Sequence, residues 1–363
     1  MNLKKKLLVG FGVALMFGAG ATNAEVTLNQ VSAFMVMPAV IGGPGIETYV
    51  TITNTGVEDI IAHVSYINGD FTSFNYCYEC DFDLELTGFD TEVLVLRTVS
   101  GITNITSEDG TVATACGFPF GFLTVNVEDP SQPANADRVL TDNVLIGSEV
   151  VVNYGAGWAF SVPAVSIRGD MGNGDRWFKF NGNEYNKLPR HLAADYIAPD
   201  FDVLGGIDAT LVLFTLGFER QFPPLVDCSV NGYDAEEQRV SASFQFGCWG
   251  VVDVCAISPE FCYPFLSQSP TRTDTHGWLH LSCRTDPDGD WPFSLDNGPQ
   301  PFANGGVHGL IVQHAAAGAV VRRNDPMAPA LIHNTAWARL LYQSVTAGEA
   351  VTLHLEAPGG DLS

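Results

Sequence analysis

Alternating aspartates in the second half of the chain form its best candidate for a metal site. Asp286, Asp288 and Asp290 are separated by Pro287 and Gly289, so they lie in a segment that favours a turn. Carboxylates at alternate positions of such a turn can converge on a hard cation, and calcium suits oxygen ligands of this kind. The sequence therefore favours a solvated acidic turn and no cofactor, with calcium binding by these three residues as the alternative.

The same run resembles the opening of an EF-hand calcium loop, in which its three aspartates would match the first three ligands. The resemblance then ends, because Trp291 stands where the sharp turn of that loop needs glycine. Asn297 stands where a bidentate glutamate would close the site. Asp170, Asn173 and Asp175 form a weaker version of the same pattern.

Aromatic residues near the middle of the chain are candidates for a ligand-stacking platform. Trp177, Phe178 and Tyr185 lie in a segment rich in Gly and Asn. Exposed aromatic rings of this kind can stack on the apolar faces of sugar rings. Aromatic residues of a β-protein more often pack in its core, and core packing is the favoured interpretation of these three residues.

The cysteines are candidates for structural disulfides, because an even number in an exported chain is typical of a disulfide framework. Cys77 and Cys80 have the spacing of a redox pair or of half a zinc site, but neither a βαβ unit nor a second ligand pair accompanies them. Three cysteines lie in the first half and five in the second, so complete pairing needs one bridge between the halves. The eight are Cys77, Cys80, Cys116, Cys228, Cys248, Cys255, Cys262 and Cys283.

Sequence motifs for nucleophilic catalysis or phosphate binding are absent. The chain contains no Gly-x-Ser-x-Gly, no His-Glu-x-x-His and no P-loop. His276 and His280 alternate on one face of a strand pattern, where they start about 13 Å apart, too far to share an ion. Carboxylates that meet only in space stay compatible with glycoside hydrolysis. The sequence therefore favours a non-enzymatic protein, with a secreted hydrolase on a β-sandwich scaffold as an alternative.

The elements that must position these residues are predominantly β-strands. Segments such as Glu47–Asn54 alternate between apolar and polar residues, and Gly, Pro, Asn and Asp separate them at regular intervals. No long apolar stripe of helical period occurs, although Leu188–Tyr196 is expected to form a short helix. We therefore predict an all-β fold of two antiparallel β-sandwich domains, immunoglobulin-like or jelly-roll-like.

Three pairs of similar segments occur in the same order in the two halves. This order, together with similar spacing of the first two pairs, indicates a tandem duplication, and the looser third pair implies an insertion in the second copy. Two unrelated sandwiches with similar strands are the alternative. The pairs are Gly45–Val50 with Gly206–Leu211, Gly121–Val127 with Gly277–Cys283, and Trp158–Ala159 with Trp337–Ala338.

The segment Tyr49–Gly56, taken with its neighbours over about residues 45–67, resembles the strand–turn–strand of bacterial cell-surface immunoglobulin-like modules. The resemblance implies an exported β-sandwich. It implies no catalytic residue.

The chain begins with the features of a signal peptide at residues 1–24. Lys4–Lys6 supply the positive start, Leu7–Ala21 is a short apolar run, and Thr22–Ala24 offers small residues for cleavage. We expect a first sandwich at 25–168, a linker at 169–200, and a second sandwich at 201–363 with a disulfide-pinned loop near 249–274. No later apolar run approaches the roughly 20 residues of a membrane helix, so stable membrane insertion is not expected.

The charge balance narrows the partners. The formal net charge is −24 at pH 7. The charged residues of the signal peptide are all lysines, so its removal makes the net charge more negative. A field of this sign repels nucleic acid and anionic lipid. The expected partners are surface proteins, polysaccharide, or other copies of the chain, in the extracellular space, at the cell surface or in the periplasm. A structural or adhesive role is favoured, with a carbohydrate-binding module, calcium-assisted or not, as the first alternative.

Overall fold

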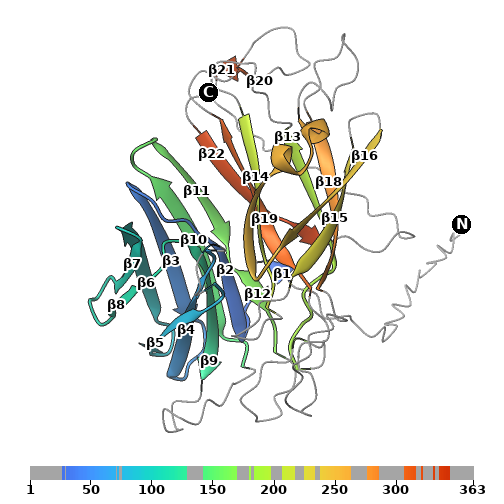
Figure 1. The fold of residues 1–363 in the computed structure, drawn as a ribbon. Coiled ribbons are helices and arrows are strands. Elements are labelled where there is room, and N and C mark those ends of the chain that lie inside the picture. Colours follow the sequence, from blue (N-terminus) through green and yellow to red (C-terminus); the bar gives the residue numbers. More distant parts are fainter. Residues whose placement is uncertain are drawn as a thin grey trace, which may run out of the picture.

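The structure is a computed structural model in which two β-sandwich domains lie side by side (Figure 1). Four antiparallel sheets build the two sandwiches, and a separate two-stranded ribbon lies near the C-terminal end of the described chain. Among the described residues, no helix has the length and apolar composition needed to cross a membrane. The structure describes residues 27–28, 30–70, 72, 76–128, 142–169, 180, 184–197, 207–216, 225–233, 238–262, 276–285, 306–315, 320–321, 330–331 and 335–343.

The first sandwich packs two six-stranded sheets against each other. Its inner sheet, which faces the second sandwich, has the order β1 (Thr27–Leu28), β12 (Val165–Ile167), β2 (Phe34–Val40), β9 (Gly121–Glu128), β4 (Ile60–Asn68), β5 (Glu79–Leu86). Its outer sheet has the order β11 (Trp158–Pro163), β10 (Leu145–Asn153), β3 (Ile46–Asn54), β6 (Thr91–Val99), β7 (Ile102–Ser107), β8 (Ala113–Cys116).

The second sandwich has a four-stranded inner sheet and a five-stranded outer sheet. The inner sheet has the order β17 (Trp249–Asp253), β14 (Ile207–Phe214), β19 (His308–Ala315), β22 (Thr335–Leu340). The outer sheet has the order β16 (Arg239–Phe246), β15 (Val226–Tyr233), β18 (His276–Thr285), β13 (His191–Ile197), β23 (Tyr342–Gln343). The short helices α1 (Val254–Ile257) and η1 (Pro259–Phe261) follow β17, and the ribbon is formed by β20 (Val320–Val321) and β21 (Ala330–Leu331).

The two sandwiches share one topology. The run β12-β2-β9-β4-β5 in the inner sheet of the first sandwich is equivalent to the run β23-β13-β18-β15-β16 in the outer sheet of the second. The run β11-β10-β3-β6 in the outer sheet of the first is equivalent to the run β22-β19-β14-β17 in the inner sheet of the second. Equivalent strands occur in the same chain order. The three similar sequence pairs fall on equivalent strands, namely β3 with β14, β9 with β18, and β11 with β22. The predicted tandem duplication accounts for this agreement.

The equivalence has a geometric consequence for how the sandwiches stack. The inner sheet of the first sandwich corresponds to the outer sheet of the second, so the two copies are stacked in the same sense rather than face to face. Apolar clusters fill the space within each sandwich, and a third cluster fills the junction between the sandwiches, where the two inner sheets meet the β10–β11 edge of the first outer sheet. Where they meet, the inner sheets are therefore buried on both faces, which explains the nearly continuous apolar sequences of β2 and of residues 211–214 in β14. Most outward side chains of β5, at the edge of the first inner sheet, stay exposed.

A covalent and aromatic contact joins the two sandwiches at one end of their interface. The Cys77–Cys248 disulfide spans them, and the Tyr76 hydroxyl donates a hydrogen bond to the Trp249 carbonyl at 2.8 Å. The indole Nε1–H of Trp249 donates to the carbonyl of Pro38 in β2 at 2.8 Å, and its ring stacks on Phe120. We infer that the two sandwiches form one rigid unit.

Glu149 and His308 are ionisable side chains that are buried in this framework. Glu149 of β10 is 0% exposed, and its carboxylate oxygens accept a hydrogen bond from the Ala39 N–H at 3.2 and 3.3 Å. Burial raises the pKa of Glu149 to about 8. His308 of β19 is 2% exposed, and its Nδ1 accepts from the Gly309 N–H at 2.8 Å. Burial lowers the pKa of His308 to about 4.

The structure corrects two local expectations. The segment Leu188–Tyr196, expected as a short helix within the linker, contributes β13 to the outer sheet of the second sandwich, where Leu192 and Ala194 alternate into the core. Residues Trp249–Asp253, expected within a loop, form β17 because they complete the inner sheet beside β14. The Cys255–Cys262 disulfide then pins the turn that contains α1 and η1.

Candidate functional site

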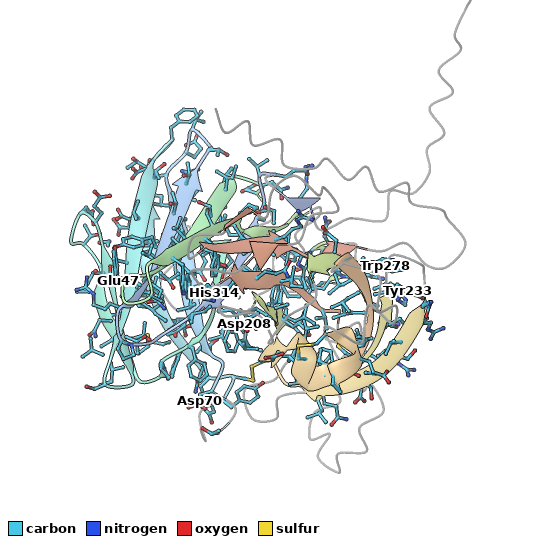
Figure 2. All side chains as sticks on the ribbon, turned by 90° about the horizontal axis from the view of Figure 1, so that it is seen from above. Glu47, Asp70, Asp208, Tyr233, Trp278 and His314 are labelled. Carbon is cyan, nitrogen blue, oxygen red and sulfur yellow. A yellow bond between two sulfur atoms is a disulfide. The ribbon has the colours of Figure 1, made fainter. Side chains whose placement is uncertain are left out.

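Two broad sheet faces lie at opposite ends of the stacked sandwiches. We define the Trp278 face as the outward side chains of β16, β15, β18 and β13, and the Tyr49 face as the outward side chains of β6, β3 and β10. Figure 2 places Trp278 and Tyr233 on the side of the molecule remote from Glu47, which belongs to the Tyr49 face. These faces are the candidate interaction surfaces of the molecule.

The Trp278 face is built by strict alternation along its strands. Val230 and Leu281 point into the core of the second sandwich, so their neighbours in each strand point outward. On the core side, the Cys228–Cys283 disulfide joins β15 to β18 at paired positions. That bridge fixes the register, and the register decides which outward side chains meet.

An aromatic pair dominates the Trp278 face. Tyr233 and Trp278 are direct cross-strand partners, with ring centroids 4.0 Å apart and ring planes inclined by 7°. Trp278 keeps 38% of its surface exposed. Stacked aromatic residues on an open sheet face offer a large, rigid contact area, which is the kind of anchor found at the centre of protein interfaces and of sugar-binding sites.

Charged and amide groups flank the aromatic pair on both sides. Arg239, opposite Tyr233 on β16, donates from Nε to the Asn231 Oδ1 at 2.8 Å, and Ser241 donates to the same oxygen at 2.9 Å. Asp195, opposite Trp278 on β13, is paired with Arg339. These contacts hold the flanking groups in place beside the rings, where they can hydrogen-bond a ligand or partner.

Two histidines extend the face along β18 and β13. The rings of His191 and His280 stack with centroids 5.6 Å apart and an interplanar angle of 8°. Burial lowers the pKa of His280, and the neighbouring His191 and Arg239 lower it further. His280 therefore presents a neutral imidazole at pH 7, able to donate and accept hydrogen bonds.

The shared topology relates this face to the interface inside the molecule. In the sequence pairing of β9 with β18, Trp278 corresponds to Phe122, and Tyr233 then corresponds to Ile67, because each pair occupies matching register positions. Phe122 is fully buried between the sandwiches, where it stacks on Phe214 with centroids 5.6 Å apart. The exposed aromatic pair therefore occupies the position through which the first sandwich contacts the second.

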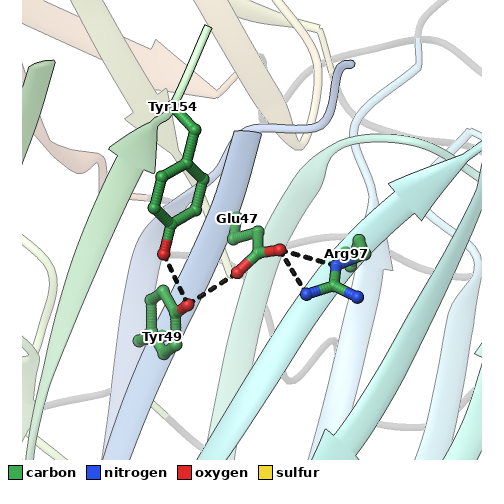
Figure 3. Close-up of polar contacts among 4 residues, drawn as sticks. All are labelled: Glu47, Tyr49, Arg97 and Tyr154. Atoms are coloured by element: carbon green, nitrogen blue, oxygen red, sulfur yellow. Dashed lines mark hydrogen bonds and ion pairs between the residues drawn. The ribbon is translucent and has the colours of Figure 1, made fainter. Parts of the chain in front are cut away.

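The Tyr49 face carries a hydrogen-bonded network at one edge (Figure 3). The Tyr49 hydroxyl donates to the Glu47 carboxylate at 2.6 Å and lies 2.8 Å from the Tyr154 hydroxyl. Glu47 is also paired with Arg97. The hydrogen bond to Glu47, with a smaller contribution from Tyr154, raises the pKa of Tyr49 above its usual value.

A shallow cavity of about 330 Å³ adjoins this network and is lined by residues 43–47 and 97–100. Arg97 offsets the charge of Glu47, which is the one carboxylate among the described residues that line the cavity. The geometry therefore provides an ordered polar surface rather than the pair of carboxylates that glycoside hydrolysis requires.

The structure places the predicted site residues as follows. Asp286, Asp288 and Asp290 lie outside the described residues, as do Trp177 and Phe178.

Tyr185, the third aromatic predicted to stack on a ligand, is 0% exposed. Its ring packs against Phe34 and Phe180, with centroids 6.4 and 5.6 Å away. Tyr185 therefore lies in the apolar cluster between the sandwiches rather than on a ligand-binding surface, because apolar residues of β2 surround it.

All eight cysteines lie in disulfides, and no cysteine is free. Cys77 and Cys80 belong to different bridges, so the Cys-x-x-Cys spacing is neither a redox pair nor half a zinc site. Four disulfides indicate an oxidising, extracytoplasmic location. The bridges are Cys77–Cys248, Cys80–Cys116, Cys228–Cys283 and Cys255–Cys262.

Tyr233 and Trp278 were not among the predicted site residues. The sequence does contain a signal for Trp278, since the pairing of Gly277–Cys283 with Gly121–Val127 aligns it with Phe122. Its exposure follows only from the stacking order of the sheets, which the sequence does not state.

Comparisons with known proteins leave the family open. No family model and no curated protein matches the chain. A solved structure described as "Crystal structure of PBSX exported protein XepA" is 10% identical over 72% of this chain and 85% of that one, with a TM-score of 0.17. A similarity at this TM-score carries no argument about fold or function.

Proposed function

We propose that this protein is an exported structural component of the cell surface or extracellular space that binds other copies of itself through the Trp278 face. The observation that carries the proposal is the equivalence between this face and the buried surface of the first sandwich. Trp278 and Tyr233 stand where Phe122 and Ile67 hold the second sandwich.

The stacking sense determines which surface would receive the Trp278 face. Inside the molecule, the inner sheet of the first sandwich contacts the inner sheet of the second, and the equivalent of that receiving sheet is the outer sheet of the first sandwich. The Tyr49 face of a second copy is therefore the complementary surface. Such a contact is heterologous, and heterologous contacts join copies head to tail.

The connection between the sandwiches supports the same assignment. The Cys77–Cys248 disulfide and the apolar cluster between the sandwiches keep the two end faces at a fixed distance and orientation. Arg239 and Arg284 on the Trp278 face are balanced by Asp195 and Asp227 on the same face, so the aromatic pair rather than net charge carries the contact.

Sedimentation velocity and electron microscopy of the mature protein test the proposal, with and without calcium because of the predicted ligands Asp286, Asp288 and Asp290. The wild type should show concentration-dependent association into linear oligomers. Trp278→Ser should remain monomeric. Phe89→Ser, which removes an aromatic residue 70% exposed in the turn between β5 and β6, should associate like the wild type. A wild type that stays monomeric, or equal association of both variants, would overturn the proposal.

Polysaccharide binding by the same face is the second candidate. The favouring observation is that the exposed Trp278 ring lies beside the hydrogen-bonding groups of Asn231, Arg239 and Ser241. An aromatic ring can stack on the apolar face of a sugar, and such groups can hydrogen-bond its hydroxyls. A glycan-binding screen of the wild type and Trp278→Ser separates the two candidates. Glycan binding by a monomeric wild type that is lost in Trp278→Ser would replace self-association as the function of this face.

A further inference from the structure

A histidine and two acidic residues meet on the inner sheet of the first sandwich, away from both end faces. His63 of β4 is the direct cross-strand partner of Asp83 on β5, and Glu128 lies at the end of the neighbouring strand β9. Strand alternation directs Val64 into the core, so His63 points to the opposite face of the sheet. Asp83 and Glu128 join it there.

The distances suit a single small cation. The His63 Nδ1 lies 2.7 Å from the Asp83 Oδ1 and 3.8 Å from the Glu128 Oε1, and the three ligand atoms all lie within 4.8 Å of one another. Ligands of a tetrahedral zinc ion, at bond lengths of about 2.0–2.2 Å, are roughly 3.3–3.6 Å apart. Small rotations of the His63, Asp83 and Glu128 side chains would therefore replace the hydrogen bond between His63 and Asp83 with three bonds to one zinc ion.

The site is accessible to an ion from solvent. The exposed fractions of the His63, Asp83 and Glu128 side chains are 27%, 55% and 22%. In the described part of the chain, no other group brings three such side chains within reach of one ion.

An unpartnered amide beside the cluster indicates that a ligand belongs there. Asn126 is the direct cross-strand partner of His63 on β9, and it is 2% exposed. Its Nδ2 has no hydrogen-bond partner in the described structure. A buried amide without an acceptor is costly, at about 1–3 kcal/mol, so it calls for an acceptor that is itself part of the site.

We propose that His63, Asp83 and Glu128 bind one zinc ion, whose water ligand accepts the hydrogen bond of Asn126. Three protein ligands and one water complete a tetrahedral set. The imidazole distinguishes this site from a calcium site, because calcium takes oxygen ligands and in larger number. The negative field of the chain, with its net charge of −24, concentrates divalent cations near the site. The proposal does not rest on self-association.

Metal binding by the chelator-treated mature protein tests the proposal. Equilibrium dialysis against zinc in excess calcium should give one tight site in the wild type. His63→Gln and Glu128→Gln should each lose that site. Asn126→Ala should weaken it by about 10–100-fold, as expected for a group that orients a metal ligand. Cobalt in place of zinc should show the strong visible absorption of a four-coordinate ion, which a six-coordinate surface ion lacks.

A matched control comes from the second sandwich. His314 and Asp208 form another His–Asp pair, with Nδ1 and Oδ2 3.9 Å apart (Figure 2). Asp208→Asn should leave the tight zinc site intact, which shows that a His–Asp pair alone does not supply it. Far-UV circular dichroism confirms that each variant is folded. Wild-type zinc binding in folded Glu128→Gln, or displacement of zinc by excess calcium, would overturn the proposal.

Discussion

Replacement of the buried Glu149 by glutamine is expected to stabilise the protein at neutral pH. The carboxyl group is fully buried on β10, where its one described partner is the Ala39 N–H. That N–H is turned toward the core by the irregularity in β2 between Met37 and Val40. A neutral amide oxygen can accept the same hydrogen bond without the desolvation penalty of a charge.

The magnitude follows from the difference between the folded and unfolded pKa. Burial raises the pKa of Glu149 from 4.5 to about 8, so the folded protein retains a proton that the unfolded chain releases between these values. The contribution of Glu149 to the stability of the wild type is therefore full below pH 4.5 and falls as the pH rises toward 8. At 1.36 kcal/mol per unit, the loss is about 3 kcal/mol at pH 7 and approaches about 5 kcal/mol above pH 8.

Chemical unfolding of the wild type and Glu149→Gln at pH 4, 5.5, 7 and 8.5 measures this loss, with the disulfides intact. The free energy of unfolding of the variant, relative to the wild type, should rise by about 3 kcal/mol between pH 4 and pH 7. An unpartnered amide proton in the variant would shift all values equally and leave this rise unchanged. Glu58→Gln, in an exposed turn, corrects for the loss of one negative charge. A difference that is the same at pH 4 and pH 7 would refute a neutral, buried Glu149.

Three other substitutions should lower or alter the stability of the protein, two at the interface between the sandwiches and one at the buried His308. Replacing Cys77 and Cys248 by alanine opens a loop of 171 residues and should lower the free energy of unfolding by about 4–5 kcal/mol, measured by denaturant unfolding without reductant. Phe122→Ala should cost about 3–5 kcal/mol by leaving a cavity between the sandwiches, with a lowered thermal midpoint as the measurement. The contribution of the neutral His308 to stability should fall by about 3 kcal/mol as the pH falls from 6.5 to 4, measured in acid unfolding titrations as the change in the difference between the wild type and His308→Asn.

The contributions of Glu149 and His308 to the pH profile of the wild type oppose each other. As the pH rises from 4.5 to 6.5, the unfolded chain binds about one proton fewer than the folded protein at Glu149 and about one proton more at His308. Glu149 therefore lowers the free energy of unfolding while His308 raises it by a similar amount, so the two contributions cancel. Above pH 6.5 only the contribution of Glu149 remains. His308 therefore accounts for the loss of stability at acidic pH, and Glu149 for the loss above pH 6.5. Glu149→Gln and His308→Asn measure the two contributions separately.

The all-β fold and most strand positions could be predicted from the sequence, because alternation and turn residues are local signals. The short strand β13 could not, since its sequence Leu192–Ala194 is compatible with a helix and only its partners in β18 and β23 select the extended form. The same holds for Glu149, which looks like an outward-facing residue of an alternating strand. Its burial depends on the irregularity in β2, more than 100 residues away in the chain.

The candidate sites were less accessible to sequence reasoning. The metal-ligand cluster joins His63, Asp83 and Glu128 from three strands, and nothing in their spacing along the chain marks them as neighbours. Tyr185 was a candidate for a ligand-stacking surface, with core packing as the favoured alternative, and the apolar interface between the sandwiches buries it. Disulfide pairing was likewise undetermined until the strands were placed, apart from the one bridge that the uneven cysteine count required between the halves.

The strength of a contact between copies can be argued from the positions that differ between equivalent faces. The buried surface of the second sandwich presents Val212, Phe214 and Leu310 to the first. The sequence pairing and strand register place Thr51, Thr53 and Ser148 at the equivalent positions of the Tyr49 face.

Hydroxyl-bearing residues in place of large apolar ones remove most of the hydrophobic driving force at these positions, about 25 cal/mol for each Å² of apolar surface no longer buried. The intramolecular interface also has a disulfide and a short tether, which raise the effective concentration of its two surfaces. A contact between copies must therefore be weaker than the contact within one copy and must depend mainly on Trp278 and Tyr233. This asymmetry is what makes Trp278→Ser a decisive variant, because the opposite face has little apolar surface with which to compensate.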